Sequence, residues 1–200
     1  MAAAGSPCLG GFALQGVLSA NRRNYSVIWS ELETALASHD SLLATDDRFA
    51  LQLFGSGFAS SIGIPSALRP KVSVFKGLRY LDYYNAIHHT LALIPAFASD
   101  AYYDRKFSST VITSLITGTP VIADAQMLRS YSFLTKDAVF LRHDGESDVS
   151  VMERVLGMPL EEVFAKRRAL TRLTAQLNVD AGVRLAGWAR VALQARLAQG

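Results

Sequence analysis

The chain has 200 residues, half of them hydrophobic and 18% charged, so it can bury a large core and is not a disordered chain. Its net charge of +3 is too small to indicate a nucleic-acid-binding protein. The single cysteine excludes an internal disulfide bond and a cysteine-rich metal site. We expect neither a signal peptide nor a transmembrane segment, because the chain lacks the necessary long apolar runs.

Short apolar segments alternate with amphipathic segments along the chain. The segments that we interpret as strands are Phe12–Leu14, Phe49–Phe54, Val72–Phe75, Leu91–Ile94, Val121–Ala123 and Ala138–Leu141. Helical spacing of apolar residues follows in segments that begin near Asn24, Leu81, Ser108 and Leu128. Strands that alternate with helices imply right-handed crossovers. We therefore predict an α/β fold: a Rossmann-like, doubly wound, mostly parallel six-stranded sheet.

The two ends of the chain differ from this central part. Residues 1–10 are mostly small, and we expect them to be flexible. Residues 11–158 contain the predicted strands and form the main domain. Residues 159–200 show helical spacing again, so we predict C-terminal helices that pack on this domain, with a bend at Asn178–Gly182.

A helix followed by a strand is predicted between residues 106 and 124. Ser108, Ser109 and Thr110 offer hydroxyl groups where this helix would begin, and such groups cap the free N–H groups of a first turn. A helix N-terminus also binds anions, because its N–H groups are unpaired and carry partial positive charge. Lys106 precedes it. The unit is therefore either a phosphate-binding turn or an ordinary capped helix.

The loop after the first strand has the same chemistry. Gly16 is followed by Arg22 and Arg23, just before another predicted helix start. The two arginines are either solvated or part of an anion site. Lys76 and Gly77, after the third strand, add a cation at the same sheet edge. Together these loops suggest a ligand with two phosphates, or one phosphate held from two sides.

The loop after the fourth strand is aromatic. It contains Pro95, Phe97, Tyr102 and Tyr103, which either stack on a base or sugar or pack as a lid. The sequence has no GxGxxG after the first strand, no GxxxxGK[ST] and no GxSxG, which argues against dinucleotide-binding, P-loop and hydrolase sites. No metal site is predicted.

Six short motifs follow one another between residues 11 and 142. They are Gln15-Gly16 with Arg22-Arg23-Asn24, Phe54–Gly57, Val74–Gly77, Tyr83–Ala86, Leu93–Pro95 and Gly118–Ala123. In this order they resemble the C-terminal, donor-binding domain of GT-B glycosyltransferases of the "glycosyl transferases group 1" type. That family usually carries two glutamates where this chain has Arg105 and Thr113. The chain therefore resembles a divergent branch, and we predict no catalytic residue within it.

The resemblance implies half of a GT-B fold that binds a nucleotide-diphosphate sugar without a metal or other cofactor, for transfer to an unknown acceptor. Catalysis would require an N-terminal acceptor domain or a partner chain. The alternatives are a non-catalytic fragment or partner subunit that binds nucleotide sugar, and a structural α/β domain without a ligand. In the family the last helix crosses to the other domain. We therefore expect an uncovered apolar face around Leu185 and Trp188.

The sharpest hypothesis places the donor's diphosphate between the loop after the first strand and the helix start at Ser108. Both loops leave carboxyl ends of strands, where ligands of such sheets bind. The predicted diphosphate site comprises Gly16, Arg22, Arg23, Lys106, Ser108, Ser109 and Thr110. The predicted vicinity of the nucleotide and sugar comprises Lys76, Gly77, Pro95, Phe97, Tyr102 and Tyr103.

Overall fold

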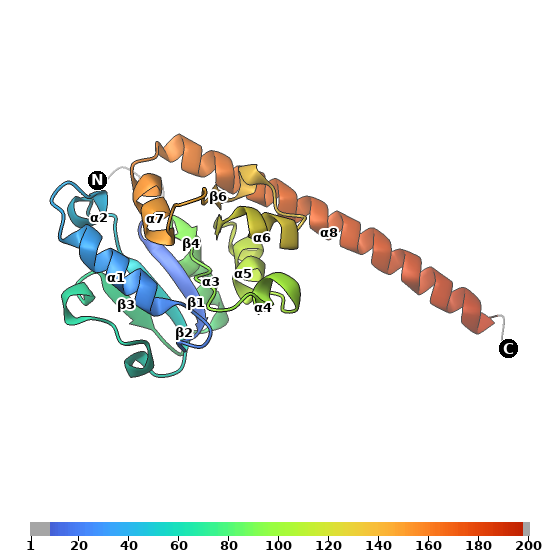
Figure 1. Cartoon of the computed structure of the whole chain (residues 1–200). Helices are drawn as coiled ribbons and strands as arrows, with labels where there is room; N and C mark the ends of the chain where they lie inside the picture. The colour runs from blue at the N-terminus through green and yellow to red at the C-terminus, as the bar shows by residue number, and fades with distance from the viewer. Residues whose placement is uncertain (1–8, 198–200) are drawn as a thin grey trace, which may run out of the picture.

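The computed structural model describes residues 9–197 (Figure 1). The expectation of a flexible N-terminus falls mainly on residues 1–8, outside the described residues. Leu9, which we had assigned to that segment, is buried.

Parallel strands form the centre of the molecule. The main sheet has the order β3-β2-β1-β4. Its strands are β1 (Phe12–Val17), β2 (Leu51–Ser56), β3 (Val72–Phe75) and β4 (Ala92–Leu93). A second sheet pairs β5 (Ile122–Ala123) with β6 (Phe140–Leu141). All pairings within the two sheets are parallel.

The prediction of one six-stranded sheet is wrong, although each predicted strand has its counterpart. Only a single parallel bridge, between Leu93 and Val121, links the four-stranded sheet to the two-stranded one. Prolines explain the break: Pro95 follows β4 and Pro120 precedes β5, and neither has an N–H group to extend a ladder. The N–H of Leu93 still donates to the Pro120 carbonyl at 2.9 Å. The Rossmann-like parallel arrangement is as predicted.

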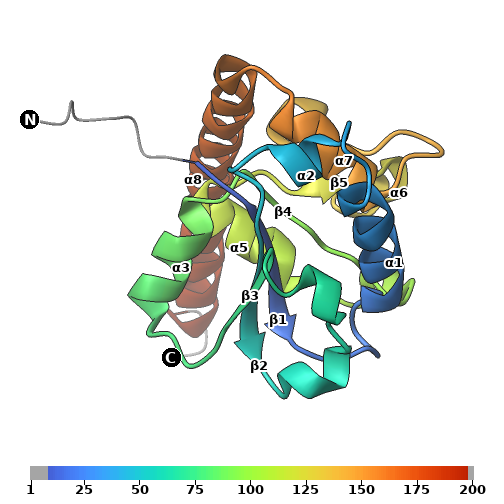
Figure 2. The ribbon, with the colours of Figure 1, turned by 90° about the vertical axis from the view of Figure 1, so that its left-hand side faces the viewer.

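Helices cover both faces of the sheet (Figure 2). One face carries α1 (Tyr25–Leu36), α2 (Leu42–Thr45) and α7 (Asp148–Leu156). The other carries α3 (Tyr80–His88), α5 (Ser109–Thr117) and the first part of α8 (Leu160–Leu197). The short helices are α4 (Ala101–Asp104) and α6 (Ala125–Ser130), with 3₁₀ turns at Ala59–Ile62, Ser66–Leu68 and Lys136–Ala138.

Successive residues of β1 enter two different cores. Phe12 and Leu14 belong to the cluster beneath α1 and α7, whereas Ala13 packs with Phe54 and Val111 on the α5 side. This follows from the period of two along a strand. Because both faces are covered, β1 is continuously apolar rather than alternating.

A pair of glycines lets the carboxyl ends of β1 and β2 approach closely. Gly16 and Gly55 are register partners in the parallel ladder. A Cβ atom on Gly55 would lie 1.7 Å from the carbonyl oxygen of Gly16, so no other residue fits there without moving a strand. Because neither glycine has a side chain, space remains at the carboxyl ends of these two strands.

The predicted bend at Asn178–Gly182 is wrong, because α8 is a single helix of 38 residues. A glycine inside a helix costs only about 1 kcal/mol and does not end it without a suitable cap. Arg167 anchors the first half, donating to the backbone oxygens of Thr90 and His88. The second half projects from the body (Figure 1). Leu185 and Trp188 are 61% and 69% exposed there, so the expected uncovered apolar face is present.

Candidate functional site

A cavity of about 410 Å³ lies at the carboxyl ends of β1 and β2, beside the first turn of α5. We call it the Arg23 cavity. Its lining includes Gly16, Arg22, Arg23, Gly55, Tyr102 and Ser109. Ligands of open α/β sheets bind at this edge. The diphosphate assigned to it stays a prediction.

Arg23 is a buried cation, only 4% exposed. Its Nη2 donates to the Gln15 carbonyl at 3.0 Å and to Thr110 Oγ1 at 3.2 Å. Its guanidinium also lies over the rings of Phe97 and Tyr102. Among residues 9–197, its Nε has no hydrogen-bond partner and no carboxylate forms an ion pair with it. Burial accordingly lowers the pKa of Arg23.

The start of α5 shows how three predicted hydroxyl groups are used. Ser108 is the N-cap, and its Oγ accepts a hydrogen bond from the Thr110 N–H at 3.2 Å, as the sequence predicts. Thr110 is fully buried behind the cavity wall. Of the three, only Ser109 lines the cavity.

Gln15 connects these groups, a role that our sequence interpretation missed. Its Nε2 donates to Ser109 Oγ and to Thr110 Oγ1, each at 3.1 Å. Its Oε1 accepts a hydrogen bond from the hydroxyl of Tyr83 at 2.8 Å. Burial raises the pKa of Tyr83 to about 12, so this phenol keeps its proton at neutral pH. Gln15 belongs to the first of the six motifs, but the motif did not reveal this role, because its partners lie 68 to 95 residues away.

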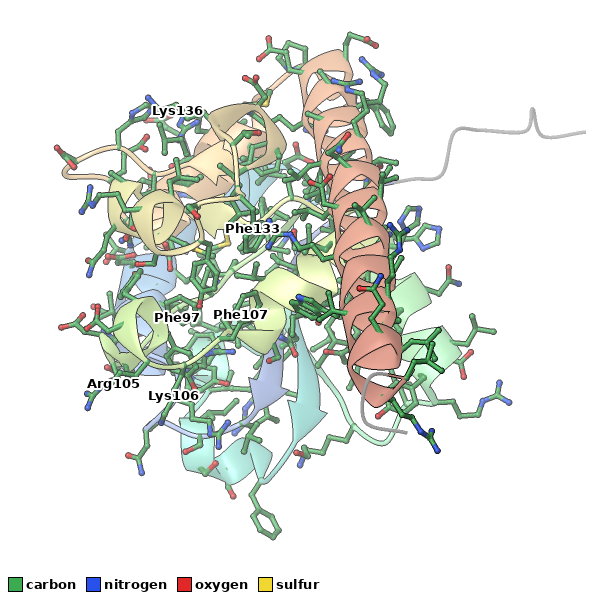
Figure 3. All side chains as sticks on the ribbon, turned by 90° about the vertical axis from the view of Figure 1, so that its right-hand side faces the viewer. Phe97, Arg105, Lys106, Phe107, Phe133 and Lys136 are labelled. Carbon is green, nitrogen blue, oxygen red and sulfur yellow. The ribbon has the colours of Figure 1, made fainter. Side chains whose placement is uncertain are left out.

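The structure brings only some of the predicted cations together. Arg22 and Arg23 line the cavity, but Lys106 is exposed and does not. Figure 3 shows Lys106 at the lower left of the molecule and Lys136 at the upper left. Lys76 is also outside the lining, with its Nζ 6.0 Å from the ring of Phe58. Gly77 has a left-handed φ of +65° in the turn after β3, also outside the lining.

The aromatic loop after β4 divides between two cavities. Tyr102 faces the Arg23 cavity, whereas Pro95, Phe97 and Tyr103 line a second one. Phe97 and Tyr102 stack with ring centroids 4.7 Å apart. The stacked pair therefore helps to separate the two spaces.

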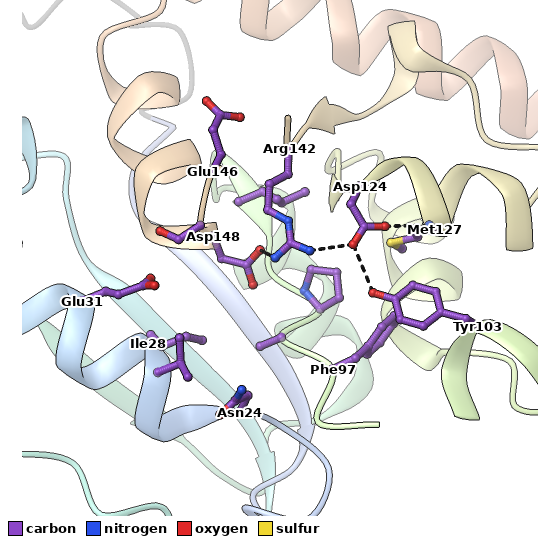
Figure 4. A pocket seen from close by; sticks show the side chains of 15 residues that line it. Asn24, Ile28, Glu31, Phe97, Tyr103, Asp124, Met127, Arg142, Glu146 and Asp148 are labelled. Carbon is purple, nitrogen blue, oxygen red and sulfur yellow. Dashed lines mark hydrogen bonds and ion pairs between the residues drawn. The ribbon is translucent and has the colours of Figure 1, made fainter. Parts of the chain in front are cut away.

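The second cavity, which we call the Asp148 cavity, has a volume of about 300 Å³ and an acidic wall (Figure 4). Arg142 pairs with Asp124 at 2.6 Å and with Asp148 at 3.2 Å. Tyr103 donates to Asp124 at 3.3 Å, and Glu31 faces the cavity from α1. Burial raises the pKa of Asp148, and Glu31 and Asp124 raise it further against the lowering effect of Arg142.

Two general tests concern metals and membranes. Within residues 9–197 no group of three His, Cys, Asp or Glu side chains is placed to hold a metal ion. No helix of the same part of the chain combines the length and apolarity that crossing a membrane requires.

Comparisons with known proteins rest on the fold. No family model and no curated protein matches the sequence. The C-terminal domain of the glycosyl transferase group 1 family protein LpcC from Francisella tularensis superimposes with a TM-score of 0.59 at 9% identity, over 84% of this chain and 85% of that domain. The pneumococcal O-GlcNAc transferase GtfA, solved with UDP and GlcNAc, has a TM-score of 0.54 at 9% identity, over 83% of this chain.

A Staphylococcus aureus TarM mutant, solved with fondaparinux, α-GlcNAc-glycerol and UDP, has a TM-score of 0.56 at 10% identity, over 84% of this chain. The chain spans 32% of the length of GtfA and of TarM. At these identities the likeness shows the fold alone. The chain has the Rossmann-like fold of the C-terminal domain of GT-B glycosyltransferases, which confirms the resemblance seen in the sequence.

Proposed function

We propose that this chain is the donor-binding domain of a glycosyltransferase and holds the diphosphate of a nucleotide sugar in the Arg23 cavity. The observation that carries the proposal is the buried guanidinium of Arg23, which has no hydrogen-bond partner at Nε and no paired carboxylate among residues 9–197. A buried charge without a counterion is costly, and an anion beside it removes that cost. Arg22 and Ser109 add a cation and a hydroxyl to the same wall.

Catalysis by the chain on its own is not part of this proposal. No Asp, Glu or His side chain lines the Arg23 cavity in the described part of the chain, so no general base stands there. The cations and N–H groups would stabilise a leaving diphosphate, a role that a metal plays in other enzymes. This lining also favours the second candidate, a subunit that binds nucleotide sugar and needs a partner chain or an N-terminal acceptor domain for transfer.

Calorimetric titration of the chain with UDP, GDP and ADP tests the proposal. We expect at least one to bind, and Arg22→Ala to weaken that binding by about one to two orders of magnitude, as losing one charge-assisted hydrogen bond would. Lys106→Ala should have a smaller effect, because Lys106 does not line the cavity. Lys136→Ala is the matched control for an exposed cation far from Lys106 (Figure 3).

Two outcomes would contradict the proposal. Binding of none of the three nucleotides at millimolar concentration would favour a structural domain without a ligand. Equal weakening by Arg22→Ala and Lys136→Ala would show that only net charge matters. Donor hydrolysis, measured for the chain alone and with candidate partner chains, distinguishes an enzyme subunit from a binding subunit.

A further inference from the structure

Gln15 touches the wall of the Arg23 cavity from behind. It is 4% exposed and sits in the middle of β1, between the start of α5 and Tyr83 of α3. It does not line the cavity itself. Any influence it has on a ligand must therefore pass through the hydroxyl groups that it contacts.

The orientation of the Gln15 amide follows from counting its hydrogen bonds. Its two N–H groups have two acceptors, Ser109 Oγ and Thr110 Oγ1, and its oxygen has one donor, Tyr83 Oη. Turning the amide over would place two hydroxyl groups on its oxygen and only one acceptor near its two N–H groups. One buried N–H would then be unsatisfied, which proteins avoid. The orientation with nitrogen towards α5 is the stable one.

This orientation determines what the two hydroxyl groups do. A hydroxyl that accepts a hydrogen bond directs its own proton elsewhere. Thr110 Oγ1 accepts from both Gln15 and Arg23, and Ser109 Oγ accepts from Gln15. Ser109 lines the cavity, so its proton can point into it. The wall thus presents hydrogen-bond donors.

We propose that Gln15 is a positioning residue that makes the hydroxyl of Ser109 a donor towards the cavity, so that the cavity takes an ionised phosphoryl group. This inference rests on the proposed function and narrows it. A phosphoryl oxygen only accepts hydrogen bonds, so it matches the wall. A neutral ligand hydroxyl in its place would accept from Ser109 without the added strength of a charged acceptor, and would bind less well.

Two substitutions at Gln15 separate this role from simple packing. Gln15→Glu keeps the shape but offers only acceptors, so the hydroxyls would turn to donate to it and away from the ligand. Gln15→Met keeps the approximate volume and leaves the hydroxyls free to rotate. With the tightest of UDP, GDP and ADP as probe, we expect Gln15→Met to weaken binding roughly threefold to tenfold and Gln15→Glu by about 100-fold or more. Affinity for the matching nucleoside should change less than about twofold.

A double-mutant cycle removes the effect of the added negative charge. Ser109→Ala should weaken diphosphate binding by about tenfold in the parent chain, since a donor is lost. In the Gln15→Glu background it should have almost no effect, because that hydroxyl no longer faces the ligand. Inorganic phosphate, titrated in parallel, shows whether the site recognises any phosphoryl group or requires the nucleoside diphosphate.

The possible failures are distinct. If the parent chain binds no nucleoside diphosphate and no phosphate, the proposed function fails and the role of Gln15 fails with it. If the parent binds but Ser109→Ala has the same effect in both backgrounds, only the role of Gln15 is overturned. Equal losses for Gln15→Met and Gln15→Glu, with lowered thermal stability in both, would show that Gln15 is purely structural.

Discussion

The two cavities at the carboxyl edge of the sheet have opposite electrostatic character. The Arg23 cavity is formed at the ends of β1 and β2 and is lined by two arginines, and no carboxylate of residues 9–197 lines it. The Asp148 cavity, at the ends of β5 and β6, is lined by one guanidinium and by the carboxylate residues Glu31, Asp124, Glu146 and Asp148. A diphosphate is attracted to the first and repelled by the second. A cavity at the carboxyl end of a strand is therefore a candidate anion site only if its lining side chains are positively charged.

The two cavities also differ in how the charge of their arginine is balanced. Arg142 is held between two aspartates in ion pairs, so it needs no ligand. Arg23 has neutral partners only, and its Nε has none in residues 9–197. A self-contained ion network serves structure, whereas an unbalanced cation beside a cavity indicates binding. The predictions below test this contrast.

Replacing Arg23 by methionine should have the largest effect. Arg23→Met removes a buried, unpaired charge and keeps most of the side-chain volume. We expect nucleoside diphosphate binding to fall by about 100-fold, while the free energy of unfolding stays the same or rises. Calorimetry and urea unfolding measure the two quantities. A variant that loses both binding and several kcal/mol of stability would show that Arg23 mainly holds β1 against α5.

Most of the fold could be predicted from the sequence, because local patterns encode it. Six apolar segments marked the six strands, and Ser108 marked the start of α5 by its capping hydroxyl. The sheet break was not predicted, because it depends on two prolines that interrupt the ladder. The continuous α8 was not predicted, because one glycine inside a helix costs too little to end it. Helix α7 was missed, although Ser147 caps it.

The candidate site was only partly predictable. Cations after strands pointed to Arg22 and Arg23, and the structure brings Arg23 within hydrogen-bond distance of Thr110. The sequence does not show which side chains turn towards a cavity, so it grouped Lys106 with them although Lys106 lies outside the lining. Gln15 was overlooked because a buried amide is defined by distant partners. The proposed roles of all these residues remain predictions.

Replacing Arg142 should lower the stability of the fold without affecting binding in the Arg23 cavity. Arg142→Met leaves Asp124 and Asp148 without a cation, and we expect a loss of roughly 2 kcal/mol of stability at pH 7, less than for a fully buried pair because Arg142 is 31% exposed. Diphosphate binding should not change. Urea unfolding and calorimetry measure these effects, and a parallel loss of binding would contradict the independence of the two cavities.

The same variant makes a prediction about pH. In the parent chain, burial and the neighbouring Glu31 and Asp124 already raise the pKa of Asp148. Without Arg142 the folded-state pKa of Asp148 rises further above its unfolded value, because the nearby cation that lowered it is gone. The folded chain then binds more protons, so stability increases as the pH falls through these values. We expect the difference in unfolding free energy between parent and variant to shrink between pH 7 and pH 4. A constant difference would contradict this account.

Replacing Tyr25 should have the smallest effect. Its hydroxyl and Arg23 Nε are the two buried side-chain polar atoms without a hydrogen-bond partner within residues 9–197, so the two residues can be compared directly. Unlike Arg23, Tyr25 lines neither cavity and packs in the core, stacked on Trp29. Its unsatisfied hydroxyl should therefore be only a packing defect. Tyr25→Phe keeps the stacking, and we expect it to raise the free energy of unfolding by about 1 kcal/mol without changing diphosphate binding.

The gain should grow in alkaline solution. Burial raises the pKa of Tyr25 to about 12, whereas an unfolded tyrosine titrates near 10. Between these values the unfolded parent releases a proton that the folded parent retains, so the parent loses stability as the pH rises and the phenylalanine variant lacks this loss. Urea unfolding of both chains at pH 7 and pH 10.5 measures the difference. A loss of diphosphate binding in Tyr25→Phe would show that the hydroxyl of Tyr25 belongs to the site. It would also show that a buried group can contribute to binding without lining the cavity.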